Sequence, residues 1–264
     1  MLITGSLDTT IKVWSRHDAS LISTLVGHTE PITATKLADA HTLVSSAQDA
    51  TLRIWDLAKN VCSRILIGHP SSIKSLDIQT HIICSGDILG NVLFWHLETG
   101  NLITSLKLVG NGLLIPVDQV KKHHEDITIS SIQLDGDRLL IATLQGTLTL
   151  FNTCSLDCST TFAQSLECAA TPNFLPHDKS VSICASSPDH TYSAGWCLAG
   201  RSDAWRLMCV TSTGVCHVWN HKTGCKLYTL SNDAQGAFTS VVFNDFYILV
   251  GTRDGSLSIW EPNA

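Results

Sequence analysis

Residues 27–56 read GHTEPITATKLADAHTLVSSAQDATLRIWD, the most complete unit of a repeat that recurs along the chain. A Gly-His pair opens the unit, two segments of alternating apolar and polar residues follow, and a polar turn carries an Asp. A third alternating segment ends in Trp-Asp. Because alternation with a period of two is typical of half-buried β-strands, the unit predicts short strands joined by turns.

Variants of the third segment recur along the chain, and each ends in an aromatic residue. They are TIKVW at Trp14, TLRIW at Trp55, NVLFW at Trp95, TLTLF at Phe151, VCHVW at Trp219 and SLSIW at Trp260. Most of the spacings between them are about 40 residues, the period of four-stranded propeller blades. The two longer spacings predict insertions, at residues 111–126 and 188–204.

Composition and charge exclude several classes of protein. The chain has 264 residues, of which 44% are hydrophobic and only 15% charged, and this argues against disorder. The net charge is −6 and no basic run exceeds Lys121 and Lys122, which argues against a nucleic-acid partner. No apolar run reaches membrane-spanning length, so no membrane partner is expected.

Targeting and redox signals point to a reducing compartment. The first ten residues, MLITGSLDTT, do not form a signal peptide. Without a secretory signal, we interpret the ten Cys residues as reduced thiols. We therefore expect a cytoplasmic or nuclear location.

The segments LITGSLDTTIKVW, LVSSAQDATLRIWD and LVGTRDGSLSIWE, with Gly-His at 27–28 and 68–69, resemble the WD-repeat β-propeller family. The resemblance covers nearly the whole chain, and it implies one all-β domain over residues 1–264. That domain is a propeller of about six four-stranded blades, with the first and last blades incomplete. We expect a truncated form, a fragment, or part of a ring, six- or seven-bladed, that another segment completes.

The family pattern also places the strands and the insertions. It puts the inner strands of blade five near residues 181–185, 206–211 and 215–219. The insertion at 111–126 is then expected on the face that the family calls the top. The insertion at 188–204 is expected on the bottom face, where Tyr192 and Trp196 form either a local hydrophobic plug or a contact patch.

The resemblance implies a hydrogen-bonded chain in blade two, made of His28, Ser45, Asp49 and Trp55. A buried carboxylate is costly unless it accepts hydrogen bonds, and a His N–H and turn amides can supply them. The rival interpretation is a nucleophilic Ser-His-Asp triad. Since the Ser lies inside an expected strand, with no sharp exposed turn and no evident oxyanion hole, we favour the structural role and do not expect an enzyme.

The other blades depart from this pattern, and we expect blades three to five to depend more on apolar packing than on a polar chain. The matching positions are Thr4, Asp8 and Trp14 in blade one; His69, Ser85, Leu89 and Trp95 in blade three; His124, Gln145 and Phe151 in blade four; Thr213 and Trp219 in blade five; and Val250, Asp254 and Trp260 in blade six.

We expect no cofactor and no metal. Cys154 and Cys158 are close in sequence, as are His123 and His124, but neither pair joins a second pair at zinc-finger spacing. There is also no Gly-rich phosphate loop and no H-E-x-x-H segment, so no small-molecule substrate is evident.

The resemblance implies a non-catalytic scaffold that binds peptides or domains of other proteins on its top face. A narrower version is the substrate-recognition module of a ubiquitin ligase. An RNA-associated scaffold and a hydrolase are alternatives of other classes, the first disfavoured by the charge. The top-face positions are Leu7, Gln48, Ile88, Leu144 and Arg253, with Glu30 and Ser71 in the loops after the Gly-His pairs. The alternative that these are ordinary loop residues stays open.

Overall fold

The structure of the chain is a computed structural model. It describes residues 1–109, 113–120, 126–135, 138–144, 147–152, 168–169, 180–184, 197–202, 206–211, 214–220, 226–231, 238–243, 247–252 and 255–261. Their regular secondary structure is strand throughout, apart from one 3-10 turn at Val117–Gln119, and turns and loops join the strands. The expected all-β fold is confirmed.

The strands form six sheets in chain order, which we name blades one to six. Blade one holds β1 (Leu2–Gly5), β2 (Ile11–Trp14) and β3 (Leu21–Leu25), and blade two holds β4 (Ile32–Leu37), β5 (Thr42–Ala47), β6 (Thr51–Asp56) and β7 (Val61–Ile67). Blade three holds β8 (Ile73–Gln79), β9 (Ile82–Asp87), β10 (Asn91–His96), β11 (Leu102–Val109) and β12 (Leu113–Pro116).

The second half of the chain repeats this plan. Blade four holds β13 (Ile129–Asp135), β14 (Arg138–Thr143), β15 (Thr147–Asn152), β16 (Cys168–Ala169) and β17 (Ser180–Cys184). Blade five holds β18 (Cys197–Ser202), β19 (Arg206–Thr211), β20 (Val215–Asn220) and β21 (Lys226–Ser231). Blade six holds β22 (Phe238–Phe243), β23 (Ile248–Thr252) and β24 (Leu257–Trp260).

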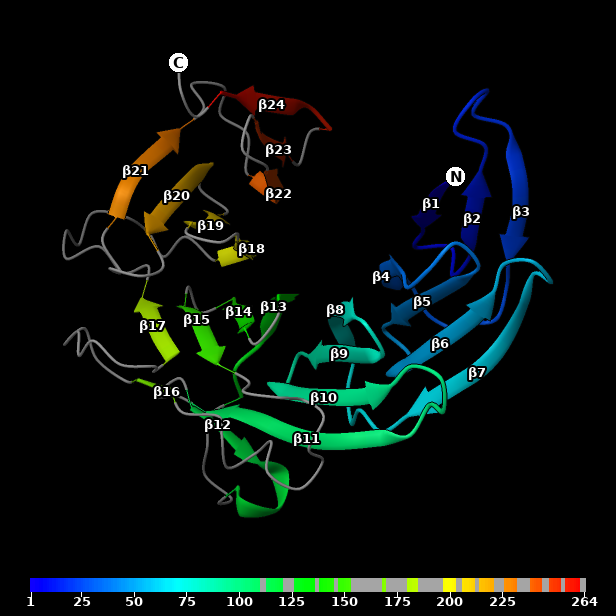
Figure 1. The fold of residues 1–264 in the computed structure, drawn as a ribbon, viewed down its shortest axis with the longest axis horizontal. Coiled ribbons are helices and arrows are strands. Elements are labelled where there is room, and N and C mark those ends of the chain that lie inside the picture. Colours follow the sequence, from blue (N-terminus) through cyan, green and yellow to red (C-terminus); the bar gives the residue numbers. More distant parts are fainter. Residues whose placement is uncertain are drawn as a thin grey trace.

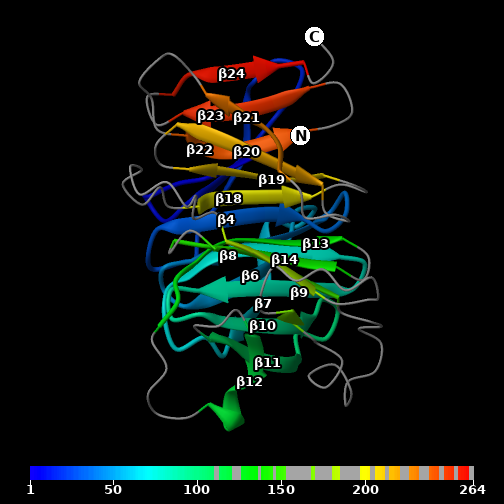
Figure 2. The same ribbon diagram turned by 90° about the vertical axis from the view of Figure 1, so that its left-hand side faces the viewer.

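The six blades are arranged around a central axis, as Figure 1 shows. Strands β4, β8, β13, β18 and β22 lie nearest the axis, and β3, β7, β11 and β21 lie at the perimeter. Blades one and six, with three described strands each, form the two ends of this arc, as expected. Seen from the side, inner strands such as β4 and β18 run roughly along this axis (Figure 2).

The blades share two irregularities of strand pairing. A register shift follows the first residue of the inner strand in blades two, three and four, after Ile32, Ile73 and Ile129. A second shift precedes the terminal Trp of the third strand, between Ile54 and Trp55 in blade two. Bulges of this kind bend and twist a strand, so each repeat unit encodes the same local geometry.

Apolar side chains pack between neighbouring blades, and this packing forms the core. Trp55 of blade two is buried against Ile11, Val13 and Leu25 of blade one. Trp95 of blade three occupies the corresponding place against blade two, among residues that include Leu52. Blades two and three therefore each bury the aromatic end of their third strand against the blade before them.

A buried carboxylate joins three blades near the axis. Lys36 of β4 places its Nζ 2.6 Å from Oδ1 of Asp77 on β8. The other oxygen, Oδ2, accepts a hydrogen bond of 2.9 Å from the backbone N–H of Leu134 on β13. Asp77 thus links blade three to blade two through an ion pair and to blade four through a backbone bond.

The structure corrects the expected position of the first insertion. Residues 113–116 form β12, which pairs antiparallel with the outer edge of β11 and so adds a fifth strand at the perimeter of blade three. The extended, apolar sequence LLIP suits this placement, because pairing with β11 gives its backbone hydrogen-bond partners and covers the edge of the sheet. Between β12 and β13 the structure describes residues 117–120 and 126–128, and the second of these stretches leads directly into β13.

The expected first strand of blade five is wrong. Ser180–Cys184 pairs antiparallel with β15 and is therefore an outer strand of blade four. Blade five begins instead with β18, Cys197–Ser202, inside the stretch expected to be an insertion. The alternation in SVSIC is the same for an inner or an outer strand, and β18 (CLAGRS) carries Gly and Arg that weaken its apolar pattern. Tyr192 and Trp196 lie outside the described residues.

Candidate functional site

Blade two contains a continuous hydrogen-bonded chain of four side chains. Nδ1 of His28 lies 2.8 Å from Oδ2 of Asp49, and Nε2 of the same ring lies 2.8 Å from Oγ of Ser45. The indole Nε1–H of Trp55 donates to the same hydroxyl at 2.8 Å. Since a carboxylate only accepts, Nδ1 carries the ring proton and Nε2 accepts from Ser45.

The electrostatics of this chain keep the imidazole neutral and the carboxylate charged. Burial lowers the pKa of His28 and outweighs the opposing hydrogen bond and charge of Asp49. Burial alone would raise the pKa of Asp49, but hydrogen bonds from Thr51, His28 and Thr29 hold that pKa below its usual range. The group is therefore set in one protonation state around neutral pH.

The position of Ser45 is incompatible with nucleophilic chemistry. The residue is fully buried inside β5, and its Oγ is shared between the imidazole and the indole. A nucleophilic hydroxyl must reach a substrate at an exposed turn with oxyanion donors beside it. The blade-two chain is a structural network.

Blade three contains an equivalent network, and the expectation that this blade lacks its Asp is wrong. Nδ1 of His69 lies 3.0 Å from Oδ2 of Asp87, and Nε2 lies 2.7 Å from Oγ of Ser85. The indole of Trp95 donates to Ser85 at 3.0 Å. The carboxylate comes from Asp87 at the end of β9, two residues before Leu89.

The turn of blade three is built around this displaced carboxylate. Ser45 pairs with Arg53 and Ser85 with Leu93, so Leu89 has the same loop position as Asp49. Asp87 accepts hydrogen bonds of 2.9 Å from the N–H groups of Leu89 and Asn91, and of 2.8 Å from Nδ2 of Asn91. Burial tends to raise its pKa, but bonds from His69 and Asn91 lower it overall.

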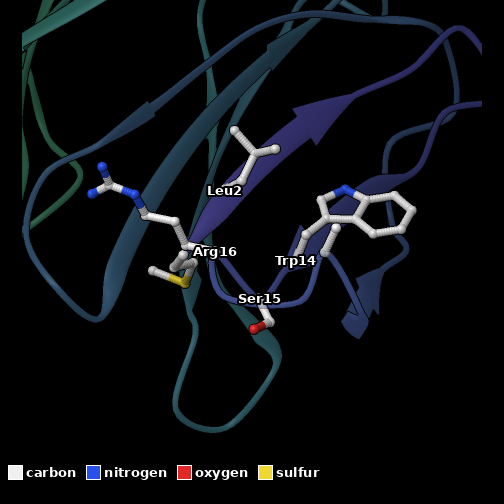
Figure 3. A pocket seen from close by; sticks show the side chains of 6 residues that line it. Leu2, Trp14, Ser15 and Arg16 are labelled. Atoms are coloured by element: carbon white, nitrogen blue, oxygen red, sulfur yellow. The ribbon is translucent and has the colours of Figure 1, made fainter.

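The network of blade one is shorter. The indole of Trp14 donates to Oγ1 of Thr4 at 2.9 Å, and Asp8 accepts from the backbone and the hydroxyl of Thr10. These last bonds lower the pKa of Asp8. The side chains of Leu2, Trp14 and Arg16 line a cavity of about 570 Å³ at the ends of β1 and β2 (Figure 3).

The remaining blades are apolar at the positions that the structure describes. Phe151 is fully buried in the core between blades three and four, and Val250 is fully buried in blade six. Trp260 packs edge-on against Phe238, with ring centroids 5.8 Å apart. Gln145, Thr213, Asp254 and His124 lie outside the described residues.

The turns between the second and third strands of the blades, β5–β6 in blade two and β9–β10 in blade three, define the top face. One backbone bond fixes each turn to the loop entering the same blade: Gln48 N–H to Pro31 O at 3.0 Å, Ile88 N–H to Ser72 O at 3.1 Å, and Leu144 N–H to Thr128 O at 2.9 Å. The structure thus brings Gln48, Ile88 and Leu144 to equivalent positions.

The other expected top-face residues differ in their surroundings. Leu7 is 77% exposed, whereas the other two apolar residues of the set, Ile88 and Leu144, are half-buried. Glu30 is also exposed. Ser71 is half-buried, and its buried Oγ has no partner among the described residues. Arg253 lies outside the described residues.

The described part of the chain has no cluster of metal-ligating side chains and no membrane-spanning helix. No group of three or more His, Cys, Asp and Glu side chains there could hold a metal ion. Cys154, Cys158, His123 and His124 lie outside that part. Its single helical turn is too short to cross a membrane.

Comparison with known proteins identifies the repeat. The family profile described as "WD domain, G-beta repeat" matches residues 19–56. Autophagy-related protein 16 of Arabidopsis thaliana is 27% identical over 210 residues, which cover 78% of this chain and 37% of that protein. WD repeat-containing protein 82 of Drosophila melanogaster is 24% identical over 98% of this chain and 72% of its own length.

A third relative is more similar over a shorter stretch. F-box/WD repeat-containing protein sel-10 of Caenorhabditis elegans is 34% identical over 116 residues, or 42% of this chain and 20% of that protein. The chain therefore spans well under half of two of these three relatives. The shared repeat supports a protein-interaction scaffold. Together with the six sheets and the two His-Ser-Asp-Trp networks of the described residues, these matches show a WD repeat at residues 19–56 and an all-β fold of propeller-type blades.

Proposed function

We propose that the chain is a non-catalytic scaffold that binds peptides or domains of partner proteins on its top face. The observation that carries the proposal is the shared backbone bond of blades two, three and four. It holds Gln48, Ile88 and Leu144 at equivalent positions with different side chains. A binding surface made of rigid turns with varied side chains needs little ordering when a partner docks.

The networks below the top face support the same role. In blade three the carboxylate of Asp87 binds the turn amides from beneath, so Ile88 and Leu89 are presented by a turn with little freedom. Thr128 of blade four donates its hydroxyl to the carbonyl of Ile88 at 3.0 Å and so fixes this turn to the next blade. Exposed apolar side chains such as Leu7 add contact area of the kind that interaction sites use.

Affinity purification of the chain with mass spectrometry would identify the main partner. We expect Ile88→Asp and Arg253→Glu each to abolish recovery of that partner while the melting temperature stays nearly unchanged. A matched control is Lys59→Glu, in the exposed β6–β7 turn at the opposite end of blade two. Full recovery of the partner by both top-face variants would contradict the proposal.

A second candidate is the substrate-recognition module of a ubiquitin ligase. It is favoured by the similarity to sel-10, whose name joins an F-box to WD repeats, although the match covers only 20% of that protein. If this role holds, purification of the full-length protein should recover ligase subunits in stoichiometric amounts. Their absence beside a strongly recovered partner would leave the general scaffold role intact and exclude the narrower one.

We also propose a cytoplasmic or nuclear location. Cys84 is buried as a free thiol in the apolar core, and burial raises the pKa of this thiol well above its usual value. Protonated thiols packed as small apolar groups suit a reducing compartment. Fluorescence microscopy of the tagged full-length protein, with a reporter for secretion as control, tests this proposal.

A further inference from the structure

The outer edges of the blades differ in how they end. In blade three, β12 pairs antiparallel with β11 and forms a fifth strand at the perimeter. In blade four, β16 pairs in parallel with β17 and also forms a fifth, outermost strand (Figure 1). Among the described residues, blade two ends at β7, and no further strand pairs with it. The perimeter of this fold therefore accepts an added strand, and blade two presents its outer edge open.

Strand β7 is suited to pairing along this open edge. Its sequence, VCSRILI, is mostly apolar, and Arg64 is its only charged residue. It contains no Lys and no Pro, the residues by which edge strands often prevent pairing with other chains. Its own pairing with β6 is regular from Arg64 to Ile67 and shifts only beyond this stretch, between Ile54 and Trp55. These four residues therefore offer a regular row of backbone groups to a further strand.

Two exposed isoleucines lie on one face of this stretch. Ile65 is 49% and Ile67 is 77% exposed, and residues two apart in a strand share a face. Blade three has Lys107 at the position of Ile67, since these residues pair with Asn91 and Thr51, the first residues of β10 and β6. Beside β12 the side chain of Lys107 is only 15% exposed. Where a fifth strand is present a lysine is thus covered, and where none is described an isoleucine stands in solvent.

The opposite face of the stretch is already packed. Leu66 is 4% exposed, and a Cβ built at Gly100, in the β10–β11 turn, would lie 2.9 Å from its Cδ2. The same Cβ would lie 3.1 Å from Cδ of Arg64. The turn of blade three therefore packs directly on β7 and holds the strand in place. New apolar contact for an added strand is available on the face of Ile65 and Ile67.

The sequence of β12 shows what kind of segment such an edge takes. Its four residues, LLIP, equal in number the regular stretch of β7. Leu113 and Ile115 are two residues apart and therefore share a face, and Ile115 stands opposite Lys107. A segment of the same kind on β7 would place its two apolar side chains against Ile65 and Ile67.

We propose that the outer edge of β7 binds an extended segment of a partner protein, which adds a fifth strand to blade two. The backbone of the segment pairs with Arg64–Ile67, and two of its apolar side chains, two residues apart, lie against Ile65 and Ile67. In this mode of recognition the backbone bonds supply affinity and the alternate side chains supply specificity. The surface lies at the perimeter, so it adds to the proposed top-face scaffold and does not depend on it.

Titration of the full chain with a synthetic peptide tests the proposal. The probe has the sequence of residues 111–118, NGLLIPVD, which contains β12. We expect the NMR amide signals of residues 61–67 to shift, and hydrogen exchange at the open edge to slow about tenfold when the free peptide is at roughly ten times its Kd. Ile67→Asp should weaken binding by about tenfold or more, because a charge replaces an apolar cross-strand contact. Since Ile67 is exposed, this variant should melt like the parent.

Two controls separate this edge from other surfaces. Val26→Asp is the matched variant, because Val26 is 70% exposed and, like Ile67, stands directly before a Gly-His pair. It should leave peptide binding unchanged. Methylation of the peptide nitrogen at Leu114 or at Ile115 tests the backbone pairing. Neighbouring amides of a strand point to opposite edges, so one of these two peptides should lose binding and the other should keep it.

Four results would overturn the proposal. The first is the absence of any shift in β7, and the second is a set of shifts confined to β11, where the peptide would only replace β12. The third is equal binding by both methylated peptides, or equal loss in Val26→Asp and Ile67→Asp. The fourth is a concentration-dependent dimer in sedimentation that Ile67→Asp abolishes, because it would assign this edge to a second copy of the chain.

Discussion

Replacing Asp87 with Ala should destabilise the chain by about 3–5 kcal/mol, because it leaves several buried hydrogen-bond donors without their acceptor. The carboxylate is fully buried and accepts from Nδ1 of His69, from the N–H groups of Leu89 and Asn91, and from Nδ2 of Asn91. Each buried donor left without an acceptor costs about 1–3 kcal/mol. Water entering the vacated space restores part of this loss, so the total stays below the sum of the four.

Two measurements check this prediction. Urea unfolding followed by tryptophan fluorescence gives the change in the free energy of unfolding. Hydrogen exchange gives a local readout, because the amides of Leu89 and Asn91 bond the carboxylate and should exchange about ten- to a hundredfold faster in Asp87→Ala.

Leu89→Ala is the matched control, since Leu89 occupies the loop position of Asp49 and is only half-buried. Removing its side chain should cost no more than about 1.5 kcal/mol, below the range for a fully buried leucine. An ordinary surface substitution changes the free energy of unfolding by up to about 0.5 kcal/mol. If Asp87→Ala changed it by no more than that, or by less than Leu89→Ala does, the blade-three network would not be stabilising.

Three further predictions follow from the same geometry. Asp49→Ala should cost about 1–3 kcal/mol by orphaning its donors, and Trp55→Ala about 3–5 kcal/mol by opening a cavity between blades one and two; equal midpoints in urea for Asp49→Ala and the parent would contradict the first. Gly90→Ala should cost at least about 1 kcal/mol, because Gly90 has φ +86° and an added Cβ would lie 2.8 Å from the carbonyl oxygen of Ile127; a circular-dichroism melt at or above the parent's would rule this out. The free energy of unfolding should fall as the pH is lowered, first near the ordinary His pKa of about 6.5 and again below about 3.9. In the folded chain the lowered pKa of His28 keeps its ring neutral, and the lowered pKa values of Asp49 and Asp87 keep both carboxylates charged. The unfolded chain therefore binds more protons in both pH windows. Urea unfolding at a series of pH values from 8 to 3 measures this, and a free energy of unfolding that did not change with pH would show that these groups are not coupled to folding.

The blades were predictable from the sequence because their signal is local. Alternation of apolar and polar residues and the terminal aromatic lie within single strands, so they predict strands such as Thr51–Asp56 and Asn91–His96 without reference to the rest of the chain. The blade-two network was predictable for a related reason. Its four residues stand at the spacing that the family pattern implies.

The blade-three network was not predicted because its carboxylate comes from a different sequence position than the carboxylate of blade two. Asp87 lies two residues after Ser85, where the pattern has none, yet from the end of β9 it reaches the same ring nitrogen. Asn91, which bonds it, was the available signal. Similarly, alternation in Ser180–Cys184 indicates a strand and does not specify whether that strand pairs with β15 or begins the next blade.

The carboxylate of Asp77 has a consequence for how the chain comes apart. In most repeat proteins each unit contacts its neighbours through separate interfaces, so units can detach one at a time. Here a single carboxyl group holds Lys36 with one oxygen and Leu134 with the other. Detaching blade two or blade four leaves the same buried charge short of a partner. Blades two to four should therefore resist mechanical pulling as one block.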